Sequence, residues 1–329
     1  MLVEITQFTM YSKKSMKEIS VVIPVYNSES CVRKLTEQLA DALRNFDYEQ
    51  IMVNDCSRDK SWENICSVVN DNFPVKAVNL RKNSGQDNAI FAGLLQAEGS
   101  YIVIMDDDLQ HSPYDIPKLY EAVKKGYDVC YADFPRKKQK VWKNMGSWLN
   151  GKTAEIIINK PSGIYLSPFK IIKSDVVKLM LESANLFPYI DGLIFQVTKN
   201  IIQISVEHHK RDSGTSNYTF RKSVQVFNKL LFGFSILPLK ISSILGFFSS
   251  LIGFILAVYY LVEHFIEKST VEGWTTIVLL ILILGGLILL SLGVIGEYIG
   301  RMYLTLNNNL RFSVSDIRIS ESLRRKEKK

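Results

Sequence analysis

The sequence has few cysteines, and they are not arranged in pairs. All of them lie in the first half of the chain, and no two are separated by only two residues: Cys31, Cys56, Cys66 and Cys130. The spacing gives no Cys-x-x-Cys motif, so a zinc site or a redox motif is not indicated. Reduced thiols of a cytosolic domain are expected instead of a disulfide framework.

Several motifs that identify other classes of protein are also absent. There is no Gly-x-Gly-x-x-Gly and no Gly-x-x-x-x-Gly-Lys-Ser/Thr, which argues against a dinucleotide-dependent oxidoreductase and a P-loop NTPase. No zinc-finger, RNP or basic-heptad pattern accompanies the formal net charge of +7, so nucleic acid is not an expected partner. The charge instead suggests a phosphorylated ligand or a membrane surface.

The N-terminal residues lack an apolar run long enough for a signal peptide. We therefore expect residues 1–18 to form a loose extension. Organised sequence begins at Ile19, so Met16 is an alternative start to Met1.

Two long stretches near the C-terminus contain no charged residue. They run from Ile241 to Val262 and from Thr275 to Ile295. Each is long enough to cross a hydrocarbon core of about 30 Å as a helix. A buried core helix is the alternative, but such a helix is rarely apolar on all sides over this length. We predict a transmembrane hairpin over residues 241–299, with spans at 241–262 and 275–299.

The charges beside the hairpin predict its orientation. Basic residues precede the first span and follow the second: Arg221, Lys222, Lys229, Lys240, Arg301, Arg311, Arg318 and the terminal RRKEKK. The linker EHFIEKSTVEG holds three Glu and one Lys. The positive-inside rule then places both termini in the cytoplasm, in an integral protein of a bacterial-type inner or plasma membrane. Residues 219–240 are predicted to form an interfacial amphipathic helix, and residues 300–329 a basic cytosolic tail.

The chain before the hairpin alternates between strand and helix patterns. The apolar runs ISVVIPV, YEQIMV, VKAVNL and YIVIM are typical of buried parallel strands, and helical patterns separate them. This alternation predicts an α/β domain with a doubly wound, mostly parallel sheet. Ligands of such sheets bind at the carboxyl ends of strands. The polar motifs PVYNSE, NDCSRDKS, RKNSGQDN and DDDLQH follow the four runs.

Three consecutive carboxylates follow the fourth run, in YIVIMDDDLQHSP. In an extended chain Asp106 and Asp108 point to the same side. Mg²⁺ or Mn²⁺ prefers such oxygen ligands and keeps positions open for phosphate oxygens, so the ion could neutralise a leaving diphosphate. A solvated acidic loop that caps the next helix is the alternative. The position directly after a buried strand favours the metal site.

The motifs PVYN, NDCS, KNSGQDNA and MDDDLQHSP, in this order, resemble the family 2 glycosyltransferases of GT-A fold. With HHKRDSGTSNY and the two spans, the chain is similar to the polyprenyl-phosphate glycosyltransferases, from Ile19 to about Arg301. This resemblance implies a cytosolic GT-A catalytic domain over residues 19–218. It also implies transfer of a sugar from a UDP- or GDP-sugar to a polyprenyl phosphate such as undecaprenyl phosphate. In-line attack would invert the anomeric centre.

The resemblance also implies roles for individual residues. The metal and diphosphate set would be Asp106, Asp108 and Gln110. The nucleotide-binding set would be Pro24, Tyr26, Glu29, Asp55 and Asp107. The basic residues for the acceptor phosphate would be Arg136, Lys143 and Arg211, and Arg211 would also join Asp106, Asp108 and Asp191 in catalysis. Homo-oligomer formation through the spans is a further implication.

Three residues depart from the family pattern, and others keep two interpretations. Ser28 stands where the family usually has Glu, Asp107 where it often has Ala, and Asn217 where it commonly has Lys. Asp191 could contact the donor sugar or act as a base toward a hydroxyl acceptor, or it could be a helix N-cap. His111 is expected to be structural or solvated. The basic segment RKKQKVWKN could bind the acceptor phosphate or cover anionic lipid.

Two other functions fit the sequence less well. One is a glycosyltransferase that uses a hydroxyl acceptor in glycolipid or surface polysaccharide synthesis. The Gln-x-x-Arg-Trp motif of processive synthases is absent, and two spans do not suggest a polymer channel. The other is a non-catalytic membrane scaffold that binds nucleotide sugars, which would tolerate loss of Asp106 and Asp108.

Overall fold

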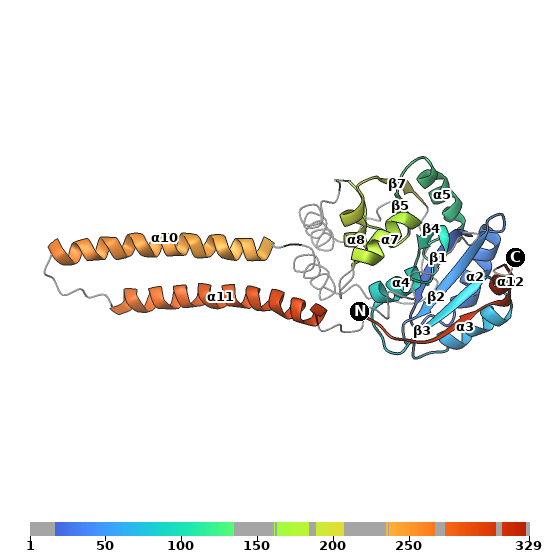
Figure 1. Cartoon of the computed structure of the whole chain (residues 1–329), viewed down its shortest axis with the longest axis horizontal. Helices are drawn as coiled ribbons and strands as arrows, with labels where there is room; N and C mark the ends of the chain where they lie inside the picture. The colour runs from blue at the N-terminus through green and yellow to red at the C-terminus, as the bar shows by residue number, and fades with distance from the viewer. Residues whose placement is uncertain are drawn as a thin grey trace. The chain divides into compact units, whose positions relative to one another are not determined.

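The computed structural model describes residues 17–134, 161, 163–183, 189–206, 235, 237–266, 274–306 and 311–326. The chain divides into two compact units (Figure 1). The sheet unit comprises residues 1–149, 159–219 and 310–329. The hairpin unit comprises residues 150–158 and 220–309. The predicted interfacial helix over residues 219–240 lies largely outside the described residues.

The sheet unit is built on one sheet with strand order β7-β5-β6-β4-β1-β2-β3-β8. The strands are β1 (Lys17–Val25), β2 (Tyr48–Asn54), β3 (Val75–Leu80), β4 (Gly99–Ile104), β5 (Val129–Asp133), β6 (Lys170–Lys173), β7 (Ile201–Ser205) and β8 (Val314–Ile319). The four central strands are parallel, whereas β6 and β8 run antiparallel to their neighbours. The prediction of a doubly wound, mostly parallel sheet is confirmed, with the central strands at the four apolar runs.

Helices cover both faces of the sheet (Figure 1). They are α2 (Val32–Ala42), α3 (Ser61–Asn70), α4 (Gln86–Leu94), the short 3₁₀ helix η2 (Pro113–Asp115), α5 (Ile116–Lys124), α7 (Ser174–Ser183), α8 (Ile190–Val197) and α12 (Glu321–Lys326). Buried residues of α2, α3 and α5 join one core with Val21, Ile23 and Met52. Helix α4 lies on the opposite face and approaches the sheet closely at Gly93, because a Cβ there would lie 2.5 Å from Cγ1 of Val22. A side chain at Gly93 would therefore displace α4.

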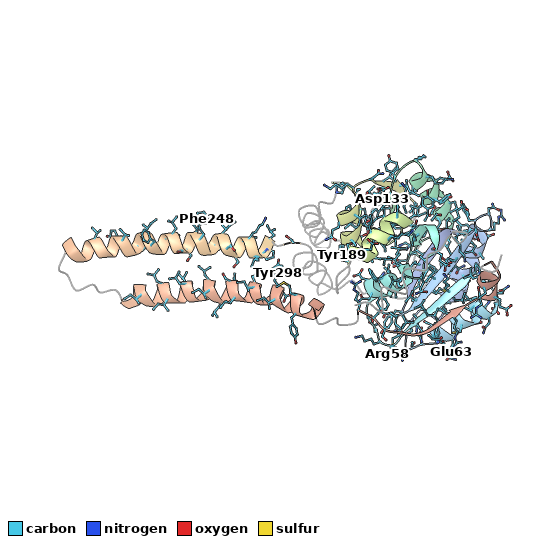
Figure 2. All side chains as sticks on the ribbon, viewed as in Figure 1. Arg58, Glu63, Asp133, Tyr189, Phe248 and Tyr298 are labelled. Carbon is cyan, nitrogen blue, oxygen red and sulfur yellow. The ribbon has the colours of Figure 1, made fainter. Side chains whose placement is uncertain are left out.

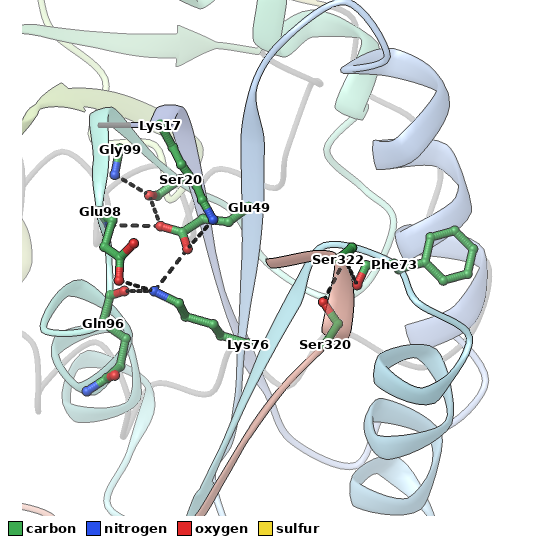
Figure 3. Close-up of polar contacts among 10 residues, drawn as sticks. All are labelled: Lys17, Ser20, Glu49, Phe73, Lys76, Gln96, Glu98, Gly99, Ser320 and Ser322. Carbon is green, nitrogen blue, oxygen red and sulfur yellow. Dashed lines mark hydrogen bonds and ion pairs between the residues drawn. The ribbon is translucent and has the colours of Figure 1, made fainter. Parts of the chain in front are cut away.

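A buried ionic cluster ties the amino ends of the central strands together (Figure 3). Glu49 of β2 is fully buried, and its Oε2 lies 3.1 Å from Nζ of Lys76 and 3.7 Å from Nζ of Lys17. Its Oε1 accepts hydrogen bonds from the Ser20 hydroxyl and from the backbone N–H of Glu98. One carboxylate thus connects β1, β2, β3 and the start of β4.

The C-terminal segment differs from the tail that the sequence suggested. Residues 314–319 form β8, which pairs with the edge of β3 from Lys76↔Ile319 to Leu80↔Val314. The backbone N–H of Ser320 also donates to the carbonyl of Val75. The alternating sequence VSDIRI is a strand signal that the basic charge of the region obscures. Strand β8 covers the edge of β3, which would otherwise present unpaired backbone groups.

The hairpin unit consists of α10 (Leu237–Ile266) and α11 (Trp274–Leu306). Each contains a segment that is long and apolar enough to cross a membrane, judged by length and composition: 237–256 and 283–300. Large apolar side chains such as Phe248 project outward along both helices (Figure 2). The Ser242 hydroxyl donates to Oγ of Ser291 at 2.8 Å, and the Tyr298 hydroxyl donates to the carbonyl of Ser235. These bonds connect α10, and the chain just before it, to α11.

Candidate functional site

The polar motifs predicted from the sequence meet at one edge of the sheet. Strands β4, β1, β2 and β3 are adjacent and parallel, so their carboxyl ends lie side by side. The motifs that follow these four strands occupy residues 26–29, 55–61, 81–88 and 106–111. This edge is where ligands of doubly wound sheets bind.

Asp107 joins the ends of β4 and β1. Its Oδ2 accepts a hydrogen bond from the backbone N–H of Tyr26 at 3.1 Å, and the side chain of Ser28 also bonds to this carboxylate. Burial raises the pKa of Asp107, and these two hydrogen bonds oppose the increase. Tyr26 is 45% exposed as a residue, which leaves it accessible for stacking on a flat ligand. Asp107 faces the protein and fixes the backbone beside that ring.

Asp106 is held by two neighbouring residues. Its Oδ1 accepts a hydrogen bond from Nε2 of Gln86 at 2.7 Å, and its backbone N–H donates to Nδ1 of His111 at 3.3 Å. The buried His111 ring is stacked against Phe134 and Phe169, each with a centroid separation of 5.3 Å. The sequence predicts a structural or solvated His111, and the structure shows it buried, with its ring accepting a hydrogen bond from the backbone of Asp106.

Asp108 stands in a tight turn. Its Oδ1 accepts the backbone N–H of Gln110 at 3.1 Å, and Leu109 between them has a φ of 60°, in the left-handed region. Non-glycine residues rarely adopt this conformation, so the surrounding contacts must impose it. The turn presents Asp108 and Asp106 at the same strand end.

The donor set at this strand end suits a hard divalent cation. Asp106 and Asp108 offer carboxylate oxygens, which are the ligands that Mg²⁺ and Mn²⁺ favour. Within the described part of the chain, no group of three or more His, Cys, Asp or Glu side chains could hold a metal. Phosphate oxygens of a ligand and water would have to complete the coordination, as is usual for Mg²⁺.

Asp55 shapes the loop between β3 and α4. Its two oxygens accept the backbone N–H groups of Ser84 at 2.6 Å and Gly85 at 2.9 Å. Burial raises the pKa of Asp55, and these two hydrogen bonds partly compensate. Gly85 has a φ of 87° and precedes the first residue of α4, Gln86. Asp55 therefore sets the start of the helix whose Gln86 contacts Asp106.

The two other residues predicted to bind the nucleotide, Pro24 and Glu29, lie at the same edge and contact other residues of the protein. Pro24 is buried in β1, opposite Val53 of β2. Glu29 accepts the backbone N–H of Lys60 at 2.9 Å, just before α3. The predicted residues Arg136, Lys143 and Arg211 lie outside the described part of the chain.

Asp191 is not a helix N-cap. Tyr189 occupies the N-cap of α8, and Asp191 is the second residue of the helix. Its Oδ1 accepts a hydrogen bond from the Tyr131 hydroxyl at 2.8 Å and is also bound by Nζ of Lys170. Sequence reasoning missed Lys170 and Tyr131, because no local pattern marks a charged or hydroxyl group inside a short buried strand.

The contact between His111 and Asp106 gives a first testable expectation. Replacing His111 by Ala removes the acceptor for the Asp106 N–H and the ring between Phe134 and Phe169. A displacement of about 1 Å at a reacting group can lower a rate by about 10²-fold, so we expect a comparable fall in any reaction rate that depends on Asp106. Steady-state kinetics measure this fall.

The matched control for this substitution is Tyr114→Phe. Tyr114 lies three residues after His111, and the substitution removes its exposed hydrogen bond to Asp41. Turnover of this control should stay within about twofold of wild type, since exposed contacts contribute little. A His111→Ala protein with wild-type turnover would show that the ring does not position Asp106.

The chain matches known proteins over nearly its whole length. The family model described as "Glycosyl transferase family 2" matches residues 20–180. The chain is 32% identical over 310 residues to an undecaprenyl-phosphate 4-deoxy-4-formamido-L-arabinose transferase of Pectobacterium atrosepticum, covering 91% of this chain and 93% of that protein. Its identity to the protein of the same name from Photorhabdus laumondii is 30% over 311 residues, covering 93% and 96%.

Solved structures match the chain at lower similarity. A glucosyl-3-phosphoglycerate synthase from Mycobacterium tuberculosis, in complex with Mn²⁺, uridine diphosphate and glucosyl-3-phosphoglycerate, has 16% sequence identity and a TM-score of 0.48. The alignment covers 65% of this chain and 79% of that one.

Proposed function

We propose, from the premise that this chain belongs to glycosyl transferase family 2 and is a GT-A enzyme of the polyprenyl-phosphate type, that it moves a sugar from a nucleoside diphosphate donor to undecaprenyl phosphate. The donor would be a UDP- or GDP-sugar. The oxygen of the lipid phosphate would attack the anomeric carbon in line, the nucleoside diphosphate would leave, and the anomeric configuration would invert.

The similarity to the undecaprenyl-phosphate transferases is the observation that carries this proposal. It extends over more than nine-tenths of this chain and of each of the two relatives, so it includes the hairpin as well as the sheet unit. The printed names of both relatives state a sugar and undecaprenyl phosphate. Two helices of membrane length also agree with an acceptor that is bound to a lipid.

The strand-end carboxylates would serve the leaving diphosphate. Asp106 and Asp108 would hold Mg²⁺ or Mn²⁺, with Gln110 close by, and the bound ion would neutralise charge on the diphosphate. Asp107 would keep the Tyr26 backbone and ring in place for the nucleotide base. Gln86 and His111 would orient Asp106.

A phosphate acceptor agrees with the contacts of Asp191. A sugar hydroxyl needs a base to take its proton, whereas a lipid phosphate is already an anion at neutral pH. Asp191 is the candidate base for a hydroxyl, and its Oδ1 is bound by Tyr131 and Lys170. A carboxylate held by these two donors suits the positioning of a substrate better than the removal of a proton from it. Arg136, Lys143 and Arg211 would bind the acceptor phosphate.

The proposed arrangement in the membrane follows from the charges beside the spans. The sheet unit and both termini would face the cytoplasm, where nucleotide sugars are available. The hairpin would keep the enzyme at the depth where the phosphate of the lipid emerges.

The test compares an anionic acceptor with its neutral counterpart. The purified full-length protein is given a panel of radiolabelled UDP- and GDP-sugars with Mn²⁺, and either undecaprenyl phosphate or undecaprenol. We expect organic-extractable, acid-labile label with one or two donors, and only with the phosphate. Equal labelling of undecaprenol would favour the hydroxyl-acceptor rival, and no labelling with any donor would contradict the proposal.

A further inference from the structure

A buried polar unit in the sheet unit consists of Tyr131, Lys170 and Asp191. The Tyr131 hydroxyl and Nζ of Lys170 both donate to Oδ1 of Asp191, and Lys170 Nζ lies 5.0 Å from the centre of the Tyr131 ring. The side chain of Lys170 is 4% exposed and that of Asp191 14%. Burial, followed by the Asp191 carboxylate, raises the pKa of Tyr131 well above its usual value, so the phenol stays a donor.

The sheet register places this unit beside the strand-end carboxylates. Lys170 of β6 pairs with Ile104 of β4 and with Tyr131 of β5, so these three side chains share one face of the sheet. Asp106 is two residues beyond Ile104, the last residue of β4, and the N–H of the intervening Met105 donates to the Val22 carbonyl. Lys170 therefore lies on the strand beside β4, opposite the residue two positions before Asp106.

One oxygen of Asp191 is not used by these contacts. Both donors bind Oδ1, and no residue in the described ranges donates a hydrogen bond to Oδ2. A buried ion pair is often no more stabilising than apolar side chains of similar size, so stability alone does not explain the unit. A carboxylate held firmly by one oxygen can offer the other to a hydroxyl group.

We propose that Lys170 and Tyr131 are positioning residues, which hold Asp191 so that its Oδ2 accepts a hydrogen bond from a hydroxyl group of the donor sugar. This inference rests on the proposed function. It adds the pair Lys170 and Tyr131 to the site, and it makes the unit a determinant of which sugar is accepted. A site built to bind a hydroxyl rejects analogues that lack it, because its buried polar groups are left unpaired.

The test uses the full-length protein, its preferred donor and deoxy analogues of that donor. We expect Lys170→Met to lower kcat/KM by about 10- to 100-fold through misplacement of Asp191. Tyr131→Phe removes one hydrogen bond and should cost roughly fivefold. Inhibition by the free nucleoside diphosphate should be unchanged in both variants. With the analogue that lacks the contacted hydroxyl, the variants should lose no further activity relative to wild type.

Lys173→Met is the matched control. Lys173 ends the same strand and pairs with Asp128 at 3.1 Å, but it lies at the opposite end of β6 from Lys170. Its removal should leave kcat/KM and the ranking of donors unchanged. If Lys170→Met does not fold, the double variant Lys170→Met/Asp191→Asn takes its place. It removes both buried charges and should fold. Its kcat/KM should fall by the same factor as that expected for Lys170→Met.

The outcomes separate this inference from the proposed function. A wild-type protein that transfers no sugar to undecaprenyl phosphate overturns both. An active wild type with unchanged kcat/KM and unchanged donor ranking in Tyr131→Phe and in the double variant overturns the inference alone. A fall in nucleoside diphosphate binding that equals the fall in kcat/KM would also overturn it, because the damage would then be general.

Discussion

Replacing Asp106 or Asp108 by Asn is expected to lower the turnover number for sugar transfer by about 10³-fold, the size seen when a main electrostatic stabiliser of a transition state is removed. Each substitution keeps the shape of the side chain and removes the charge that would bind Mg²⁺ or Mn²⁺. The cation would stabilise negative charge on the leaving diphosphate, so its loss acts on the chemical step. Initial rates of label transfer at saturating Mn²⁺ and donor measure the effect.

The fold should survive these substitutions. Three adjacent carboxylates repel one another, so removing one charge should not lower Tm. Asp71→Asn is the control, because Asp71 is an exposed carboxylate paired with Arg33, outside the strand-end motifs. It should keep activity within about twofold of wild type. A double variant of Asp106 and Asp108 with substantial transfer activity would contradict metal-assisted transfer and favour the scaffold rival.

Replacing Glu49 by Gln is expected to destabilise the sheet unit by about 3–5 kcal/mol, as for other buried pairs that lose one partner. Glu49 is fully buried, and its Oε2 lies within 4 Å of two lysine ammonium groups (Figure 3). Gln can still accept from Ser20 and Glu98 through one oxygen, but its amide N–H₂ would face Lys17 and Lys76. For a unit of this size, Tm should fall by about 10 °C, which differential scanning calorimetry measures.

Lys17 provides the matched control for Glu49. Burial lowers the pKa of Lys17, and its Nζ has no hydrogen-bond partner in the described part of the chain. Lys17→Met should therefore leave Tm unchanged or raise it. The double variant Glu49→Gln/Lys17→Met should recover part of the loss, since one buried cation is gone. A Glu49→Gln protein with the same Tm as wild type would show that the cluster is not a principal link between the strands.

The central strands and the strand-end motifs could be predicted from the sequence because their signals are local. Apolar runs mark β1 to β4, and the alternation with helices is sufficient for a parallel sheet. The membrane-length helices are equally local, since an uncharged run needs no partner to be recognised. Strand β8 has a local signal too, the alternation in VSDIRI, but its partner β3 lies more than two hundred residues earlier.

The contacts that shape the site could not be predicted, because they join residues far apart in the chain. Tyr131 and Asp191 are separated by 60 residues, and Tyr26 and Asp107 by 81. The resemblance marked Asp55 and Asp107 as nucleotide residues. It could not reveal that both carboxylates bind backbone N–H groups of the protein, because such bonds depend on how neighbouring strand ends meet.

The most direct test of the account is the position of Mn²⁺ in crystals of the full-length protein grown with Mn²⁺ and the nucleoside diphosphate of its donor. Anomalous scattering at the manganese edge locates the ion independently of the chain. The account predicts one strong peak that contacts a carboxylate oxygen of Asp106 or Asp108 and the diphosphate. A diphosphate bound at this edge with no manganese beside it, or manganese bound elsewhere in the sheet unit, would contradict the account.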